Sequence, residues 1–207
     1  MIQEHPHGHV ESTPELEAYY RELEAANTQA LWNVLAEQMT DYPKPRALPF
    51  LWRYRDVRPL LFRAGELVTP ERANRRVVCL VNPTLKHLCA ATSTLLANIQ
   101  MVLPGEVAPA HRYTAAALRF VMEGGGAYTA VDGERTIMRP GDLVLTPNWT
   151  WHDHGNESGQ PIIWQDGLDV PLVNAVDGMF FEAYQGMQQE YTRPVGASLR
   201  SRSQRGA

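Results

Sequence analysis

From residue 76 onward the chain is a succession of short runs rich in Val, Ile, Leu, Thr and aromatic residues. The runs read VVCLV, LLANIQMVL, ALRFVM, AYTAV, RTIM, DLVLTP and PIIWQDGL, with turn-forming residues between them. Between AYTAV and ERTIM lies Asp132-Gly133, a favoured two-residue hairpin turn because both positions must tolerate positive φ. Many short strands joined by turns predict a sandwich or a barrel, and we expect a small jelly-roll barrel.

The residues before position 76 show patterns typical of helices and of an irregular connector. STPELE offers Thr13 as a cap and Pro14 at the first helical position, and it predicts one helix from residue 12 to about residue 40. DYPKPRALPFLWRYRDVRPLL carries four prolines and predicts an irregular connector, with a helical turn near PERANRR. We therefore expect three parts: an N-terminal helical extension and connector (1–75), a barrel (76–192) and a flexible tail rich in Arg, Ser and Gly (193–207).

Composition narrows the function classes. The formal net charge of −4 and the sequence pI of about 6.0 give no reason to expect nucleic acid or an anionic membrane as a partner. Neither a membrane-spanning run nor a signal peptide is recognisable, so a cytoplasmic location is expected. Cys79 and Cys89 have apolar neighbours and no metal-ligand spacing, which predicts buried structural thiols.

The stretch AHRYTAAALRF (110–120) places unusual side chains in one row. Interpreted as a single β-strand, it puts His111, Tyr113 and Arg119 on one side, with two alanines between them that leave room for a ligand. Such groups on the inner face of a small barrel are costly unless they bind something or each other. The pattern predicts either a binding site or a polar interior whose members satisfy one another.

Two further rows have the same character. His152 and His154 share one face of LTPNWTWHDHGN with Asp153 opposite, and Asn98 and Gln100 share one side of ANIQMV. Two imidazoles are good ligands for iron, zinc, nickel or copper, and a phenolate can complete such a site. An inward arginine has the planar fork that binds a carboxylate, although it can equally pair with an internal acid.

Two motifs add a resemblance. The pattern G-x5-H-x-Y begins at Gly105, and G-x5-P-x-W-x2-H-x3-N begins at Gly141; together they resemble the two signature motifs of the cupin superfamily. The fuller string LPGEVAPAHRYTAAALRFVMEGGGAYTAVDGERTIMRPGDLVLTPNWTWHDHGN resembles the N-terminal cupin of gentisate 1,2-dioxygenases and of their salicylate and 1-hydroxy-2-naphthoate relatives. The likeness extends to about Leu199, and it implies a mainly β cupin barrel preceded by an N-terminal helical extension.

The resemblance also implies an activity. Members of this family are mononuclear non-haem Fe(II) enzymes that open the ring of a small aromatic acid, of the gentisate or salicylate type, with O2. The metal positions carried over by motif are His111, Tyr113 and His152. The implied substrate-binding positions are Arg75, Gln100, Arg119, His154 and Asp166. Among these, Arg119 is expected to hold the carboxylate, and His154 to hydrogen-bond substrate or oxygen and to move a proton.

Two departures from the family pattern qualify this expectation. Tyr113 stands where the family has a second histidine, and a phenol with a pKa of about 10 must lose its proton to ligate well and then favours Fe(III). We therefore expect weaker Fe(II) binding and reduced or lost activity, unless His154 takes the place of the missing ligand. Family members also resemble two cupins in tandem, whereas this chain lacks a second, which favours self-association into a homo-oligomer.

The departures leave a second hypothesis open. It is a catalytically silent cupin that binds an aromatic acid or serves as an assembly module. A metal-dependent isomerase or decarboxylase on the same barrel has no specific residue in its favour.

Overall fold

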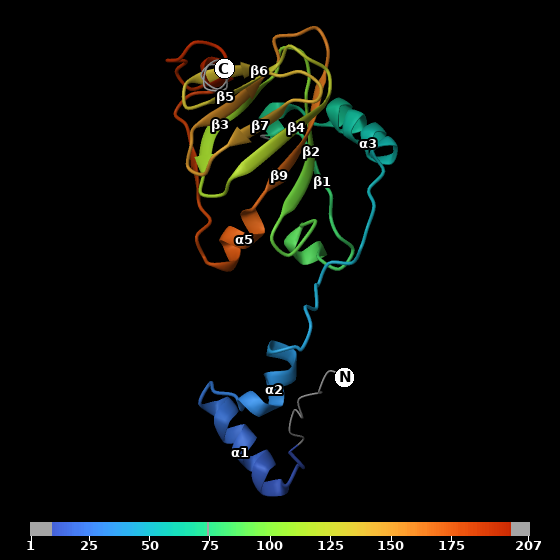
Figure 1. Cartoon of the computed structure of the whole chain (residues 1–207), viewed down its shortest axis with the longest axis vertical. Coiled ribbons are helices and arrows are strands. Elements are labelled where there is room, and N and C mark those ends of the chain that lie inside the picture. The colour runs from blue at the N-terminus through green and yellow to red at the C-terminus, as the bar shows by residue number, and fades with distance from the viewer. Residues whose placement is uncertain (1–9, 74, 200–207) are drawn as a thin grey trace, which may run out of the picture. The chain divides into compact units, whose positions relative to one another are not determined.

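The structure is a computed structural model that describes residues 10–73 and 75–199. The chain separates into two compact units, Met1–Pro45 and Arg46–Ala207, which are described here one by one (Figure 1).

In its described residues, 10–45, the first unit holds two helices, α1 (Pro14–Ala25) and α2 (Leu31–Gln38). Thr13 caps α1 as predicted, since its side chain accepts a hydrogen bond from the backbone N–H of Leu16 at 3.2 Å. The prediction of one continuous helix was wrong. The chain turns at Asn27, which has a φ of 52°, a left-handed conformation that interrupts an α-helix and that asparagine tolerates better than most residues.

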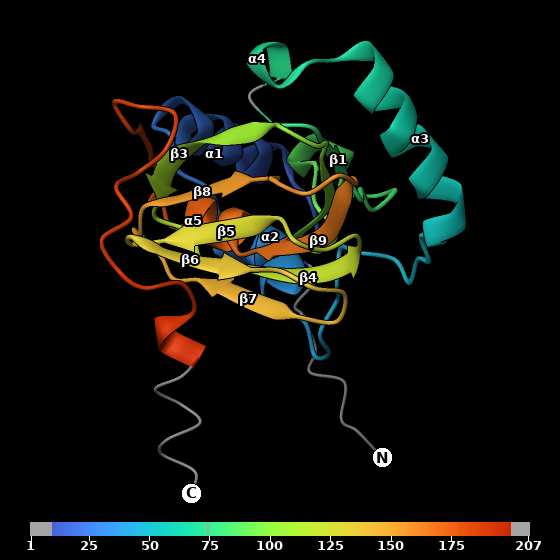
Figure 2. The ribbon, with the colours of Figure 1, turned by 90° about the horizontal axis from the view of Figure 1, so that it is seen from above.

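The second unit is built on two antiparallel sheets of five strands within residues 75–199. One sheet has the order β1-β2-β9-β4-β7 and the other β10-β3-β8-β5-β6. The strands are β1 (Val77–Cys79), β2 (Leu96–Val102), β3 (Val107–Tyr113), β4 (Ala117–Glu123), β5 (Tyr128–Val131), β6 (Glu134–Ile137), β7 (Leu143–Thr146), β8 (His152–Gly155), β9 (Ile162–Leu168) and β10 (Phe181–Ala183). Figure 2 shows the strands of the two sheets arranged around a common interior. The predicted mainly β cupin barrel with preceding helices is confirmed.

Three helical segments accompany the barrel besides a short 3-10 helix at Lys86–Leu88. They are α3 (Tyr54–Leu67), α4 (Pro70–Ala73) and α5 (Val170–Ala175). The turn predicted near PERANRR is α4, but the connector predicted to be irregular contains α3. Pro59 leaves one backbone hydrogen bond of α3 unmade, and burial of Leu61 against the outer face of β2 and β9 offsets that loss.

Apolar side chains fill one end of the interior. Trp164 and Ile162 of β9 pack there with Val102, Val121 and Met138, all of them buried. On the outside of the same sheet, Ile99, Met101 and Ile163 pack under α3. The strands β2 and β9 are therefore packed on both faces, and this packing supports the interior polar groups that they carry.

The stretch 110–120 is not one strand, and that prediction was wrong. Its first part is the end of β3, its last part is the beginning of β4, and residues 114–116 carry the chain from one sheet to the other. The run of small alanines lacks the Gly or Pro that marks a sharp turn, so the crossing left no local signal. His111 and Arg119 nevertheless both lie in the interior, each 3% exposed, because they project from facing sheets.

The structure tests two smaller predictions. The hairpin turn is confirmed, with φ of 43° at Asp132 and 78° at Gly133 between β5 and β6. The cysteines were wrongly predicted as buried, since Cys79 and Cys89 are both exposed. The apolar neighbours in sequence were misleading for Cys79, because it lies on the short edge strand β1, which pairs within the sheet with β2 alone.

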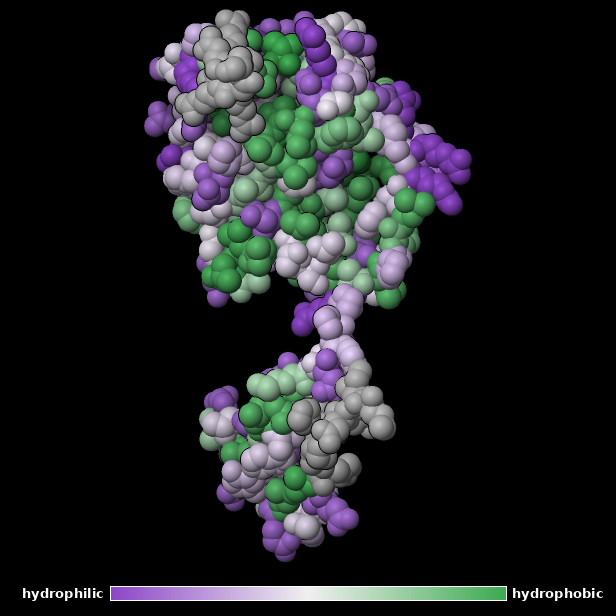
Figure 3. Space-filling model, viewed as in Figure 1, coloured by the Kyte–Doolittle hydropathy of each residue, from purple (hydrophilic) through white to green (hydrophobic). Residues whose placement is uncertain are grey.

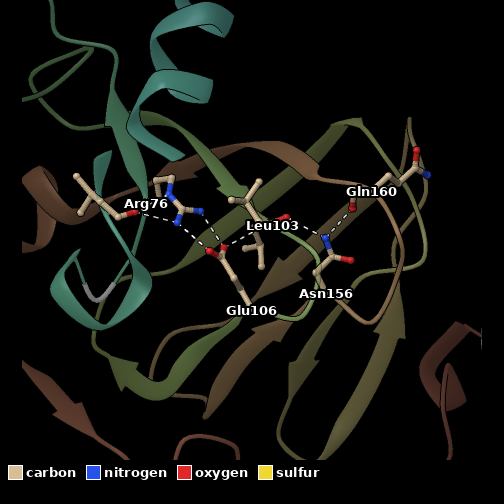
Figure 4. Close-up of polar contacts among 7 residues, drawn as sticks. Arg76, Leu103, Glu106, Asn156 and Gln160 are labelled. Atoms are coloured by element: carbon tan, nitrogen blue, oxygen red, sulfur yellow. Dashed lines mark hydrogen bonds and ion pairs between the residues drawn. The ribbon is translucent and has the colours of Figure 1, made fainter. Parts of the chain in front are cut away.

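A polar brace closes one end of the barrel (Figure 4). The two terminal nitrogens of Arg76 each donate to Glu106 at 2.8 Å, and Glu106 also accepts from the backbone N–H of Leu103 at 2.8 Å. Beside it, the amide of Asn156 donates to the carbonyl oxygens of Val102 at 2.9 Å and Gln160 at 2.8 Å. The brace therefore ties the segment before β1 to the β2–β3 turn and the β2–β3 turn to the β8–β9 loop.

The expected division at residues 75 and 192 stays a prediction. Residues at the start of the expected tail hydrogen-bond to the β5–β6 hairpin, with Arg193 N–H donating to Gly133 and Gly196 N–H donating to Arg135. Residues 200–207 lie outside the described part of the chain. Within the described residues, no helix combines the length and apolar character needed to cross a membrane.

Two glycines with positive φ allow the cost of the backbone conformation to be distinguished from the cost of steric crowding. Gly124 has a φ of +77°, and a Cβ there would overlap the carbonyl oxygen of Pro161 and lie 2.9 Å from the Cα of Ile162. Gly141 has a φ of +92°, but a Cβ there meets no described atom within 4 Å. We expect Gly141→Ala to lower the free energy of unfolding by about 1–2 kcal/mol, and Gly124→Ala by about 3 kcal/mol or more, in urea unfolding. Equal losses would show that the close approach to Pro161 costs nothing.

The brace predicts a second difference in stability. The side chains of Arg76 and Glu106 are 3% and 18% exposed, whereas those of the surface pair Arg112 and Glu182 are 25% and 46% exposed. Glu106→Gln leaves a buried guanidinium without its counter-charge and is expected to cost about 3 kcal/mol of unfolding free energy. Glu182→Gln, the matched control, is expected to cost less than about 1 kcal/mol. Similar costs for the two variants in thermal and urea unfolding would contradict a special role for the brace.

Candidate functional site

The residues predicted from sequence for the site come together in the barrel interior. Arg75, just before β1, is half-buried, and the others are buried. They are Gln100 on β2, His111 and Tyr113 on β3, Arg119 on β4, His152 and His154 on β8, and Asp166 on β9. Both sheets therefore contribute, and no single strand carries the site.

The three predicted metal ligands converge. His111 and His152 are cross-strand partners in the β3–β8 pair, and their ring centres are 4.0 Å apart. The ring of Tyr113 lies 5.2 Å from that of His111 and 4.9 Å from that of His152. Within the described part of the chain, no three His, Cys, Asp or Glu residues are grouped so as to hold a metal ion, since the third member of this cluster is a tyrosine. Metal binding by these residues stays a prediction.

The backbone orients both imidazoles. His152 Nδ1 lies 3.0 Å from the carbonyl oxygen of Thr150, and His111 Nδ1 lies 3.1 Å from that of Pro109. A proton on each Nδ1 would donate to these oxygens and leave each Nε2 with a free lone pair, the arrangement typical of metal-binding histidines. The Nε2 atom of His152 is buried and has no hydrogen-bond partner among the described residues.

Arg75 competes for one of these rings. Its Nη2 donates to the carbonyl oxygen of Pro109 at 2.9 Å and also contacts His111 Nδ1. An arginine can only donate, so this contact requires His111 Nδ1 to accept, whereas the contact with Pro109 requires the same atom to donate. The two contacts of Nδ1 therefore belong to different tautomers of His111.

Burial and two arginines keep the histidines neutral. Burial and, to a lesser extent, the nearby Arg119 lower the pKa of His152 to about 3. The pKa values of His111 and His154 are likewise held far below the ordinary value, first by burial and then by the nearby guanidinium groups. All three rings are therefore uncharged at neutral pH and available as ligands or as hydrogen-bond partners.

Arg119 and Asp166 form the charged centre of the other sheet. They are cross-strand partners in the β4–β9 pair, with 3.3 Å between Arg119 Nε and Asp166 Oδ1. The contact lacks the alignment of a hydrogen bond, so the Nε–H has no partner among the described residues, while Nη1 donates to Thr146. Trp164 donates to Asp166 at 3.0 Å, and burial raises the pKa of Asp166 to about 6.

His154 lies apart from the ligand cluster. Its ring centre is 6.0 Å from that of His152 and 5.1 Å from that of Trp164, and its Nδ1 is 2.9 Å from the hydroxyl of Thr129. The substitution of His154 for a missing ligand stays a prediction. Burial also raises the pKa of Tyr113, an effect that Arg119 opposes.

Sequence reasoning missed three residues that support the site: Thr129, Thr146 and Trp164. Trp164 shares the face of Asp166 by the two-residue repeat of a strand, which was a usable signal. The two threonines had no such signal. They matter only because β5 pairs with β8 and β7 pairs with β4, which are pairings between segments distant in sequence.

Comparison with known proteins places this geometry in a family. A cupin domain model matches residues 98–171. Gentisate 1,2 dioxygenase 1 of Aquipseudomonas alcaligenes is 50% identical over 187 residues, which make up 90% of this chain and 54% of that protein. The 1-hydroxy-2-naphthoate 1,2-dioxygenase of Nocardioides sp. (strain KP7) is 40% identical over 154 residues, 73% of this chain and 40% of that protein.

A solved structure agrees with the sequence match. Salicylate 1,2-dioxygenase from Pseudoaminobacter salicylatoxidans, in a crystal structure of its gentisate adduct, superposes with a TM-score of 0.84 at 38% identity. The match covers 90% of this chain and 51% of that one, and the chain spans about half the length of the curated relatives it matches. By sequence and by fold, the chain contains a cupin domain and is homologous to gentisate and salicylate 1,2-dioxygenases over about half of their length.

Proposed function

We propose that the barrel interior binds an aromatic acid with an ortho-hydroxyl group, of the gentisate or salicylate type. The proposed reaction is cleavage of its ring with O2, with a mononuclear iron as cofactor. One observation carries the proposal: four buried polar atoms in the interior have no hydrogen-bond partner among the described residues. They are Asn98 Oδ1, Gln100 Nε2, Arg119 Nε and His152 Nε2.

Unpartnered buried polar atoms are rare in folded proteins, because each costs about 1–3 kcal/mol of desolvation. Here they are neighbours through the sheet register, since Asn98 and Arg119 both lie opposite Asp166, on the two sides of β9. Gln100 Nε2 and Arg119 Nε are donors, and they suit the oxygen atoms of a bound acid. A ligand with several acceptor oxygens would relieve the donors together.

The charge balance favours an anion. The guanidinium groups of Arg75 and Arg119 both act on the three histidines, and the carboxylate that faces them is Asp166. Burial lowers the pKa of Arg75 only to about 10, so Arg75 is charged at neutral pH. One buried and one half-buried guanidinium beside one carboxylate leave a positive charge that a ligand carboxylate can neutralise.

This arrangement supports separate roles for two residues. The Nε–H of Arg119 makes no aligned hydrogen bond among the described residues, and Arg119 is proposed to hold the carboxylate of the acid. His154 is neutral, lies on the adjacent sheet and already contacts Thr129, and it is proposed to hydrogen-bond the substrate or O2 and to move a proton. The relatives support the substrate class, since their names include gentisate, 1-hydroxy-2-naphthoate and 5-aminosalicylate dioxygenases.

Iron fits part of the ligand set. The Nε2 atoms of His111 and His152 suit such an ion, which would supply the redox chemistry with O2 that no side chain provides. Tyr113 does not fit Fe(II) as a third neutral ligand, because a phenol ligates well only after it loses its proton.

The same tyrosine favours a second candidate function. A barrel that keeps the two arginines, Gln100 and His154 but lacks the third imidazole can bind an aromatic acid without transforming it. This silent binding or assembly module shares the pocket with the enzyme and differs only in the fate of the acid.

A cytoplasmic homo-oligomer also belongs to the proposal. Large apolar side chains are exposed on the outer face of β4 and β7, and Figure 3 shows hydrophobic surface gathered on this side of the barrel. Leu143 is 60% exposed, Leu145 55%, Phe120 45% and Leu118 38%. Contiguous exposed apolar side chains of this kind typically mark interaction surfaces.

The pocket is tested by calorimetric titration of the metal-free protein with salicylate and gentisate. Arg119→Gln should weaken binding by about 10- to 100-fold, because it removes a charge-assisted hydrogen bond to the carboxylate. Arg112→Gln changes a surface arginine that directly follows His111 in the chain but lies outside the interior, and it should leave affinity unchanged. If Arg119→Gln unfolds, the double variant Arg119→Gln with Asp166→Asn keeps the interior free of an unpaired carboxylate. Unchanged affinity in either folded variant would contradict the assignment of Arg119.

The reaction is tested by O2 consumption with gentisate after anaerobic loading with Fe(II). We expect Tyr113→His to consume O2 at least about 10-fold faster than the natural protein, because the third ligand becomes a neutral imidazole. Tyr113→Phe serves as the control and should be inactive. If Tyr113→His binds gentisate and Fe(II) but consumes no O2, ring cleavage is excluded for this barrel and the silent binder remains.

A further inference from the structure

Tyr113 is the one member of the ligand cluster that becomes an anion when it loses its proton. Its side chain lies on the inner face of β3, two residues from His111, and is 9% exposed. Two neutral imidazoles and one phenol therefore share a small interior space. The question is which metal ion such a set selects.

The distances suit one shared ion. Two imidazoles that ligate an ion through Nε2 at about 2.1 Å and at right angles hold their ring centres roughly 4.5 Å apart. A phenol bound through its oxygen holds its ring centre farther from the ion, so its distances to the imidazole centres are longer. The observed values follow this order, with 4.0 Å between the imidazoles and 4.9 and 5.2 Å to the phenol.

The set does not fit Fe(II) as three imidazoles do. A phenol becomes a strong ligand as phenolate, and a bound cation supplies the driving force to remove its proton, as cations do for other coordinated groups. The Coulomb attraction of a phenolate for a trivalent ion is about one and a half times that for a divalent ion at the same distance. The anionic oxygen therefore adds more to the binding of Fe(III) than to the binding of Fe(II).

We infer that His111, Tyr113 and His152 form a two-imidazole, one-phenolate site that selects Fe(III) over Fe(II). On binding, the Tyr113 hydroxyl releases its proton to solvent and its oxygen bonds to the ion, with no change in the oxidation state of either partner. Proximity to Arg119 stabilises the phenolate form electrostatically. The site lies in the same part of the barrel interior as the proposed function, but it does not depend on an aromatic acid.

Other parts of the cluster agree with a metal at this place. The lone pair of His152 Nε2 is buried without a partner, so an ion there meets a ligand whose desolvation has already occurred. For His111, a metal on Nε2 fixes the proton on Nδ1 and the hydrogen bond to Pro109. The contact of Arg75 with Nδ1 must then break, which frees that guanidinium for an anionic ligand.

The test compares metal retention and colour without any aromatic acid. The natural protein and three variants are loaded with ferric citrate in air, or with Fe(II) under anaerobic conditions, and then dialysed before metal analysis and visible spectroscopy. The variants are Tyr113→Phe, Tyr113→His and Tyr54→Phe, the last a control tyrosine at the start of α3, packed against the outer face of the sheet and outside the interior. Thermal unfolding checks that each variant is folded.

The natural protein and Tyr54→Phe are expected to retain Fe(III) at least about 10-fold better than Fe(II), with a visible phenolate-to-iron charge-transfer band. Reduction with dithionite should bleach the band and release the iron to bipyridine. Tyr113→Phe should lose both the band and most of the Fe(III), and Tyr113→His should retain Fe(II) without colour. The inference is overturned if the natural protein retains no Fe(III), if it retains Fe(II) equally well, or if the band survives in Tyr113→Phe.

The outcome is independent of the aromatic acid. Loss of the charge-transfer band with intact salicylate binding would reject the Fe(III) site and leave the proposed pocket standing. A band without salicylate or gentisate binding would support the metal site and reject the proposed substrate class.

Discussion

Arg119 and Asp166 face each other across the β4–β9 pair in the interior of the barrel, and the rest of the site is arranged around this pair. A buried ion pair is stable only when its remaining donors and acceptors find partners. Asp166 finds one in Trp164 and Arg119 finds one in Thr146, but the Nε–H of Arg119 does not. The protein therefore keeps a buried charged donor without an aligned hydrogen bond, which costs folding free energy and favours the binding of an anion.

Much of the fold was predictable because its signals are local. Alternation located the strands, Asp132-Gly133 located a hairpin, and the two-residue spacing of His152 and His154 put both rings on one face. The errors arose where local signals compete with tertiary contacts. Prolines concealed α3, whose apolar residues gain their stability from the outer face of β2 and β9, and alanines concealed the crossing from β3 to β4.

The site residues also divide into those that local signals predict and those that depend on tertiary contacts. The row of His111 and Tyr113 follows from strand periodicity within one segment, whereas the contact between Arg119 and Asp166 depends on which strands become neighbours. Pairing between segments nearly fifty residues apart cannot be read from composition or spacing. The family motif supplied these positions, and the strand register explains physically why they meet. Neither strand periodicity nor the family motif indicated Thr129 and Thr146, since they act only through partners on neighbouring strands.

The brace at one end of the barrel connects stability to the site. Gly105 N–H donates to the carbonyl oxygen of Asn156 at 2.8 Å, and Asn156 N–H donates to that of Glu106 at 3.0 Å. These bonds join the start of β3 to the end of β8, the two strands that carry the predicted ligands. Arg76 holds Glu106 from outside this junction, and Arg75, its neighbour in the chain, reaches His111. A shift of β3 against β8 would therefore separate His111 from His152 and disturb the brace at once, so the stability of the barrel and the spacing of the two imidazoles are controlled by the same contacts.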